Sequence, residues 1–170
     1  MEKNIVLTGF MGTGKNAVGR QLAKKLDMRL LDVDAEIEAR QNMSIDDIFK
    51  TYGEKRFRDI ETEMLQYCSE KRNVIIATGG GAVLREENMA HLRKNGIIFC
   101  LIASPETIYK RTSRSDKRPL LNVENPMAKI KELLEYRRPF YEKAGIMIDT
   151  DKRSPLEIAE EIVEIVKCRR

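Results

Sequence analysis

A short glycine-rich run near the start of the chain has the residue types and the spacing to bind phosphate. It follows the apolar stretch Ile5-Val6-Leu7 and reads Gly9-Phe10-Met11-Gly12-Thr13-Gly14-Lys15-Asn16-Ala17. A glycine, four residues and a Gly-Lys pair between a strand and a helix form a phosphate-binding loop, whose backbone N–H groups point at the anion. An ordinary glycine-rich turn is the alternative, but it does not explain the lysine. The pattern predicts that a nucleotide is bound by Gly12, Thr13, Gly14, Lys15, Asn16 and Ala17.

Two carboxylates follow the second predicted strand, residues 29–32. Asp32 and Asp34 are delivered to the edge of the sheet that also carries the phosphate loop. One carboxylate suits water-mediated binding of Mg²⁺, and the other can accept a proton from an attacking hydroxyl. A helix N-cap aspartate is the simpler alternative.

A glycine triplet and three scattered arginines complete the candidate site. Gly79, Gly80 and Gly81 come directly after an apolar strand, residues 74–78, where a bare backbone can approach a small polar ligand. A flexible connector is the alternative. Guanidinium groups bind carboxylate or phosphate through two parallel hydrogen bonds. Three such groups in separate segments therefore suggest an anionic substrate, although each can also be a solvated surface charge; they are Arg58, Arg118 and Arg137.

The hydrophobic pattern predicts alternating strands and helices, which favours an α/β fold with a parallel sheet and helices on both faces. The strands are expected at residues 4–8, 29–32, 74–78, 97–103 and 146–149, with the first strand central. Helices are expected between them, including two that are separated at Tyr52-Gly53 and one capped by Ser154. The segment from Ser113 to Pro126 is polar, basic and without a period, as in a mobile surface loop.

Composition bounds the function classes. At 170 residues the chain is long enough for one domain with a sizeable core. Its three cysteines lack metal-ligand spacing, and we interpret them as reduced thiols in apolar surroundings of a cytoplasmic protein. The longest apolar run, Ile97 to Ala103, is too short to span a bilayer.

The charge distribution and the single histidine do not indicate a further function. The net charge of +4 gathers partly around residues 110–118, but no aromatic residues alternate with the cations. We therefore expect no nucleic-acid partner. His91 lies on a predicted helix outside every motif and is not a catalytic candidate.

Taken together, these motifs resemble the shikimate kinase family, small P-loop kinases related to the nucleoside monophosphate kinases. The resemblance runs nearly end to end. It rests on Gly9-Phe10-Met11-Gly12 with Gly14-Lys15, Asp32-Val33-Asp34, Phe57-Arg58-Asp59-Ile60-Glu61, Ala77-Thr78-Gly79-Gly80-Gly81, Arg118-Pro119-Leu120-Leu121 and Arg137-Arg138-Pro139-Phe140-Tyr141.

The resemblance implies a three-layer P-loop kinase fold with a central five-stranded parallel sheet. It implies a single domain over residues 1–170, a helical substrate-binding insertion at about residues 33–61 and a mobile lid at about residues 113–125. The implied ligands are shikimate, ATP and Mg²⁺. The shikimate-binding set is Asp34, Arg58, Glu61, Gly79, Gly80, Gly81 and Arg137.

The implied reaction transfers the γ-phosphoryl group of ATP to shikimate, with Lys15, Asp34 and Arg118 as catalytic residues. Arg111 and the turn from Arg153 to Pro155 resemble the elements that contact adenine. Because Asn16 replaces the hydroxyl that normally ligates Mg²⁺, the metal is expected at Asn16 and Asp32 with waters. We expect a monomer. A related sugar-acid kinase, such as a gluconate kinase, and a nucleotide-binding protein without activity stay as alternatives.

Overall fold

The computed structural model describes residues 3–113, 121 and 123–169. Within that part of the chain, five parallel strands form one sheet in the order β2-β3-β1-β4-β5. The central position predicted for the first strand is confirmed. The strands are β1 (Asn4–Gly9), β2 (Arg29–Asp32), β3 (Val74–Ala77), β4 (Gly96–Ile102) and β5 (Ile146–Asp149).

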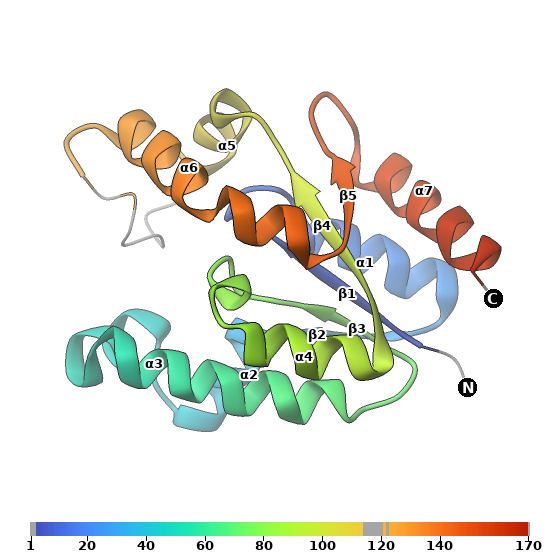
Figure 1. Cartoon of the computed structure of the whole chain (residues 1–170), viewed down its shortest axis with the longest axis horizontal. Coiled ribbons are helices and arrows are strands. Elements are labelled where there is room, and N and C mark those ends of the chain that lie inside the picture. Colours follow the sequence, from blue (N-terminus) through green and yellow to red (C-terminus); the bar gives the residue numbers. More distant parts are fainter. Residues whose placement is uncertain (1–2, 114–120, 122, 170) are drawn as a thin grey trace.

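Helices cover both faces of this sheet and give the three layers seen in Figure 1. A hydrophobic core lies on each face of the sheet. Successive side chains of β1 point to opposite faces and therefore contribute to both cores. Val6 packs in a core with α3, α4 and α6, whereas Ile5 and Leu7 pack in a second core with α1 and α7. The helices are α1 (Lys15–Leu26), α2 (Val33–Gln41), α3 (Ile45–Ser69), η1 (Ala82–Leu84), α4 (Glu86–Asn95), α5 (Pro105–Thr112), α6 (Pro126–Ala144) and α7 (Pro155–Cys168).

Helix α3 changes direction within its length. Two helices were predicted with a stop at Tyr52-Gly53, and the structure has one element with a kink at Gly53 (φ 78°, ψ 171°). Only glycine reaches this backbone conformation without strain. Ser44 caps the first part by accepting from the N–H of Asp47. The kink separates a short arm, residues 45–52, from the long arm that carries Arg58 and Glu61.

One detail of the cysteine interpretation is wrong. Cys68 and Cys100 are buried as expected, but Cys168 is exposed near the end of α7. Val166, two residues earlier, faces the core. Positions two apart lie on nearly opposite sides of a helix, which places Cys168 in solvent.

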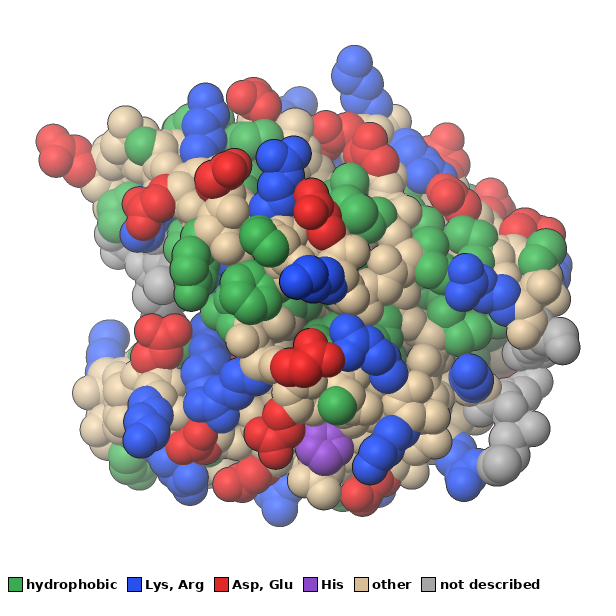
Figure 2. All heavy atoms as spheres, viewed as in Figure 1, with side chains coloured by type: hydrophobic (Ala, Val, Ile, Leu, Met, Phe, Trp, Pro, Cys, Tyr) green, Lys and Arg blue, Asp and Glu red, His purple; other side chains and the backbone are tan. Residues whose placement is uncertain are grey.

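The surface carries both signs of charge. On the face shown in Figure 2, lysine and arginine side chains are interspersed with aspartate and glutamate. On this face the positive excess is therefore not gathered into one basic surface. In the described part of the chain, no helix combines the length and the apolar character needed to cross a bilayer.

Candidate active site

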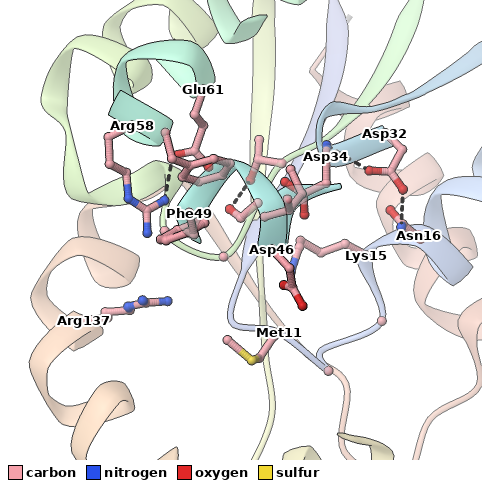
Figure 3. Close-up of a pocket in the computed structure, with 18 of the residues that line it drawn as sticks. Met11, Lys15, Asn16, Asp32, Asp34, Asp46, Phe49, Arg58, Glu61 and Arg137 are labelled. Atoms are coloured by element: carbon pink, nitrogen blue, oxygen red, sulfur yellow. Dashed lines mark hydrogen bonds and ion pairs between the residues drawn. The ribbon is translucent and has the colours of Figure 1, made fainter. Parts of the chain in front are cut away.

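The carboxyl ends of β1, β2 and β3 open into one cavity of about 660 Å³. Ligands of parallel α/β sheets bind at this edge. Figure 3 shows the labelled side chains facing the cavity from several separate elements. The predicted site residues that line it are Gly12, Gly14, Lys15, Asn16, Ala17, Asp32, Asp34, Arg58, Glu61, Gly79, Gly80, Gly81, Arg111 and Arg137.

The loop between β1 and α1 has the backbone of a phosphate nest. Gly12 and Gly14 adopt φ values of 80° and 95°, which favour glycine. Helix α1 begins at Lys15 without a side-chain cap and without an acidic residue in its first turn. N–H groups at such a helix start attract anions. The Nζ of Lys15 donates to the carbonyls of Gly9 and Phe10, at 2.8 and 2.9 Å, so its ammonium lies beside the nest.

Asp32 is both a helix cap and a neighbour of the loop. Its Oδ1 accepts from the N–H groups of Asp34 (3.1 Å) and Ala35 (3.3 Å), so the simpler N-cap interpretation is confirmed. Its Oδ2 accepts from Nδ2 of Asn16 at 2.6 Å. These oxygen atoms suit a hard cation such as Mg²⁺. The described residues contain no cluster of three or more acidic, histidine or cysteine ligands, so a cation here would take further oxygen ligands from waters or from a bound ligand.

Asp34 lies close to the carboxylate of Glu61, and a Cβ on Gly79 would approach both groups. The pKa of Asp34 is raised from 3.8 to about 6, mainly by burial and also by the negative charges of Glu61 and Asp32, while the positive charge of Lys15 opposes the shift. A carboxyl group with such a pKa can be ionised at neutral pH and still take up a proton readily. The structure therefore places a candidate base beside the phosphate loop.

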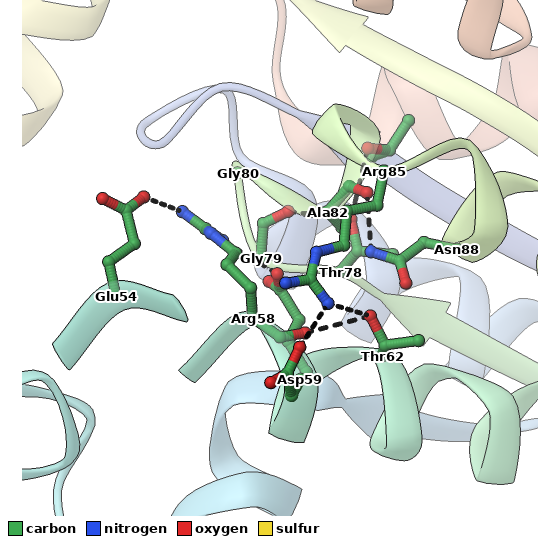
Figure 4. A network of polar contacts seen from close by, with 12 residues as sticks. Glu54, Arg58, Asp59, Thr62, Thr78, Gly79, Gly80, Ala82, Arg85 and Asn88 are labelled. Carbon is green, nitrogen blue, oxygen red and sulfur yellow. Dashed lines mark hydrogen bonds and ion pairs between the residues drawn. The ribbon is translucent and has the colours of Figure 1, made fainter. Parts of the chain in front are cut away.

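Arg58 and Glu61 form a buried ion pair on the long arm of α3. Nη1 of Arg58 lies 2.8 Å from Oε2 of Glu61, and the two side chains are 11% and 1% exposed. On its outer side, Arg58 also lies 3.4 Å from the exposed carboxylate of Glu54 (Figure 4). Burial raises the pKa of Glu61, although Arg58 opposes the shift. The other oxygen of Glu61, Oε1, is buried and has no hydrogen-bond partner among the residues that the structure describes, as expected where a ligand group completes the contacts.

The glycine triplet makes room for this charged cluster. A Cβ on Gly81 would lie 2.5 Å from both Nη atoms of Arg58. A Cβ on Gly79 would lie 2.7 Å from Oε1 of Glu61 and 3.0 Å from Oδ1 of Asp34. From the sequence, we expected the bare backbone of the triplet to let a ligand approach closely. The structure shows that it lets the side chains of Arg58, Glu61 and Asp34 pack against the backbone.

Arg137 closes the cavity from α6. It is 4% exposed, and its Cζ lies 5.6 Å from the ring centre of Phe10. Its Nε is buried and has no hydrogen-bond partner in the described part of the chain. One turn later, the hydroxyl of Tyr141 donates to the carbonyl of Gly80 at 2.8 Å. Burial raises the pKa of Tyr141 to about 12, so the hydroxyl stays a donor at neutral pH. Tyr141 thus ties α6 to the glycine triplet.

Some predicted site residues lie elsewhere. Thr13 is buried and its hydroxyl donates to the carbonyl of Phe10, so it supports the loop from within. Arg153 pairs with Glu161 at 2.6 Å outside the cavity, and Pro155 begins α7. By contrast, Arg111 reaches the cavity and donates to the carbonyl of Gly12. Arg118 and most of the proposed lid, at about residues 113–125, lie outside the described residues.

The sequence did not point to several other parts of the site. Phe49 and Phe57 stack with ring centres 4.5 Å apart on either side of the kink in α3. The i, i+4 spacing of Ile45 and Phe49 was a usable signal for a cavity-facing stripe. Further lining residues that were not predicted are Met11, Asp46, Lys50 and Thr78.

A polar network behind the site was not predicted either. Nη1 of Arg85 donates to Oδ1 of Asp59 at 2.8 Å and to the hydroxyl of Thr62 at 3.3 Å (Figure 4). Thr62 in turn donates to the carbonyl of Arg58. These contacts hold the segment after the glycine triplet against α3 beside Arg58. They join residues 23 and 26 positions apart, which no local pattern reveals.

Comparison with known proteins identifies the family. The shikimate kinase family model matches residues 11–167. The chain belongs to the shikimate kinase family. The shikimate kinase of Thermodesulfovibrio yellowstonii is 54% identical over 162 residues, which cover 95% of this chain and 94% of that protein.

Solved structures of the shikimate kinase family agree along the whole chain. The shikimate kinase of Acinetobacter baumannii in complex with shikimate superposes with a TM-score of 0.96 at 37% identity, and covers 100% of this chain and 96% of that one. The Bacteroides thetaiotaomicron enzyme gives a TM-score of 0.90 at 31% identity, covering 97% and 98%. The three-layer fold with a five-stranded parallel sheet is thus that of the family.

Proposed function

We propose that this chain is an ATP-dependent kinase that phosphorylates a ring hydroxyl of shikimate and yields shikimate 3-phosphate and ADP. The observation that carries the proposal is the arrangement of one cavity. Two buried guanidinium groups, Arg58 and Arg137, line the same space as a carboxylate with a raised pKa, Asp34, and the phosphate loop. The family assignment supports the same reaction, a step in the biosynthesis of aromatic amino acids.

On the substrate side, Arg58 and Arg137 bind the carboxylate of shikimate. Burial makes such contacts strong, because charges attract each other more where water is excluded. Asp34 accepts a hydrogen bond from a ring hydroxyl. Glu61 orients Arg58, and the triplet from Gly79 to Gly81 leaves room for the ring beside these charges.

On the nucleotide side, the residues from Gly12 to Ala17 hold the phosphates of ATP. Arg111 and the turn from Arg153 to Pro155 are proposed to contact the adenosine part. Asn16 and Asp32 provide oxygen ligands for Mg²⁺, which supplies neutralisation of phosphate charge when it is bound with ATP. Arg118, on a lid at about residues 113–125, is proposed to reach the γ phosphate.

The chemistry needs little covalent work from the protein. Asp34 takes the proton of the attacking hydroxyl, whose oxygen bonds to the γ phosphorus. The bond from that phosphorus to the oxygen bridging the β and γ phosphates breaks, and ADP leaves with the electron pair. Lys15 stabilises the charge that spreads over the transferred group. Alignment of the two oxygens provides much of the rate.

A substrate panel tests the proposal. ADP release is measured in a coupled assay with saturating Mg²⁺ and ATP, using shikimate, gluconate and a nucleoside monophosphate as acceptors. We expect shikimate to give the highest kcat/KM by about two orders of magnitude or more, because a site that pairs buried polar groups strongly rejects ligands that leave them unpaired. Preference for gluconate would indicate the related sugar-acid kinase. ATP binding without release for any acceptor would indicate a nucleotide-binding protein without this activity.

Two further parts of the proposal concern the state of the protein. We propose that it works as a monomer, because one chain supplies groups for both substrates to a single cavity. We also place it in the cytoplasm, which suits its free thiols at Cys68, Cys100 and Cys168.

A further inference from the structure

Asn16 has a defined orientation towards Asp32. Its Nδ2 lies 2.6 Å from Oδ2 of Asp32 (Figure 3). An ionised carboxylate only accepts hydrogen bonds, so the NH₂ end of the amide must face Asp32. The amide oxygen Oδ1 is therefore the end of Asn16 that remains to ligate a cation.

Only one oxygen atom of Asp32 keeps a lone pair for a cation. Oδ1 accepts from the first N–H groups of α2, and Oδ2 accepts from Asn16. The carboxylate thus contributes negative charge, an anchor for Asn16 and, through Oδ2, one ligand oxygen, and all three are the same whichever residue stands at position 16. The ligand that residue 16 itself offers decides how well a small cation is held in this loop.

An amide and a hydroxyl differ as ligands at this position. The oxygen of asparagine is separated from Cα by one more bond than the oxygen of serine, so it lies farther from the loop backbone. Mg²⁺ requires nearly ideal octahedral geometry at about 2.0–2.1 Å and gives up its waters reluctantly. Ca²⁺ accepts amide oxygens at about 2.3–2.6 Å in flexible geometry. A displaced neutral oxygen therefore penalises Mg²⁺ more than Ca²⁺.

We propose that Asn16 sets the divalent-cation preference of the nucleotide site, so that this chain couples Mg²⁺ to nucleotide weakly and discriminates poorly between Mg²⁺ and larger oxygen-binding cations. The inference rests on the nucleotide and metal binding of the proposed function, but not on the identity of the phosphate acceptor. Asn16 acts here as a specificity residue for the cation.

Calorimetric titration with ADP tests the inference without catalysis. The dissociation constant of ADP is measured with a chelator, with Mg²⁺ and with Ca²⁺. The ratio of the metal-free value to each metal value is the coupling factor. For the natural chain we expect the factors for Mg²⁺ and Ca²⁺ to agree within about threefold. In Asn16→Ser we expect the Mg²⁺ factor to rise about tenfold and the Ca²⁺ factor to change less than threefold, because the hydroxyl restores the tighter geometry.

Two further variants control the result. Asn95→Ser makes the same chemical change on an exposed asparagine at the amino ends of the strands, and should leave both factors unchanged. Asn16→Thr supplies the alternative hydroxyl and should reproduce the serine result if Asn16→Ser does not fold. Equal Mg²⁺ factors in the natural chain and the hydroxyl variants, or an equal rise for Ca²⁺, would overturn the inference while leaving the kinase proposal intact. Absence of ADP binding to the natural chain under every condition would contradict the proposed function itself.

Discussion

The proposed nucleotide side and the proposed substrate side of the cavity are built in different ways. The nucleotide side consists mainly of backbone, with positive φ values at Gly12 and Gly14 and an uncapped helix start at Lys15. The substrate side consists of buried charged side chains from different elements, above all Arg58, Glu61 and Arg137. One side is specified by a short stretch of sequence, whereas the other exists only after the chain has folded.

Because of this difference, mutations on the two sides should affect stability and ligand binding differently. A backbone nest tolerates changes in nearby side chains, because its N–H groups are fixed by the loop conformation. A buried charge cluster does not, since each charge depends on the others to offset its lost hydration. Substitutions on the substrate side should therefore alter stability and shikimate binding together, and leave ADP binding nearly unchanged.

Asp34→Asn should have the largest effect. The variant cannot accept a proton, so we expect kcat to fall by about 10²- to 10⁴-fold. The dissociation constant of ADP should change little, because Asp34 lies on the substrate side. Steady-state kinetics and ADP titration measure the two quantities. A kcat for the variant within a factor of three of the natural value would show that Asp34 is not the general base.

The raised pKa of Asp34 also predicts how stability and activity change with pH. Because the pKa of Asp34 is raised in the fold from 3.8 to about 6, its ionised form is disfavoured there. The natural chain should lose stability relative to Asp34→Asn as pH rises from about 4 to above 6, by about 1 kcal/mol between pH 5 and pH 8. The kcat/KM of the natural chain should fall below about pH 6 as the base becomes protonated. Denaturant unfolding and pH profiles measure both.

Glu61→Ala should have the next largest effect. It leaves Arg58 buried without its 2.8 Å partner, which typically costs about 3–5 kcal/mol of unfolding free energy. Glu54→Ala is the matched control, because it removes an exposed carboxylate from the same arginine and should cost less than about 1 kcal/mol. Only Glu61→Ala should raise the KM for shikimate. An equal loss of unfolding free energy in the two variants would show that the buried ion pair does not contribute more to stability than the exposed one.

Tyr141→Phe should have the smallest effect. It removes only the hydroxyl that donates to the carbonyl of Gly80, a contact worth about 1 kcal/mol. We expect the KM for shikimate to rise about fivefold with kcat and ADP binding nearly unchanged. Tyr136→Phe, on the exposed side of the same helix, should change none of these values. A similar effect in both variants would show that Tyr141 does not position the glycine triplet.

The sequence predicted the sheet well because its signals are local. Each predicted strand appears within about a residue or two of its expected bounds, and the kink at Gly53 falls where the helix break was predicted. The phosphate loop was equally visible, since glycine spacing and one lysine define it. Asp32 and Asp34 could be placed at the site because parallel strands end at the same edge.

The remaining contacts could not be derived from the sequence alone. Tyr141 meets Gly80 across 61 residues, and Arg85 meets Asp59 across 26. The reason for the glycine triplet also needed the fold, because the side chains that exclude a Cβ come from α2 and α3. Resemblance to a family supplied Asp59, Gly80 and Tyr141 within its motifs, but not Arg85, and only the structure shows which residues touch.

The identity of the phosphorylated product tests the account most directly. The chain is incubated with ATP, Mg²⁺ and shikimate, ADP is quantified, and the acceptor is analysed by phosphorus NMR and mass spectrometry. The account predicts one shikimate 3-phosphate for each ADP and little ADP release when shikimate is omitted. Equal ADP release with and without shikimate, or ADP without a phosphorylated acceptor, would contradict it.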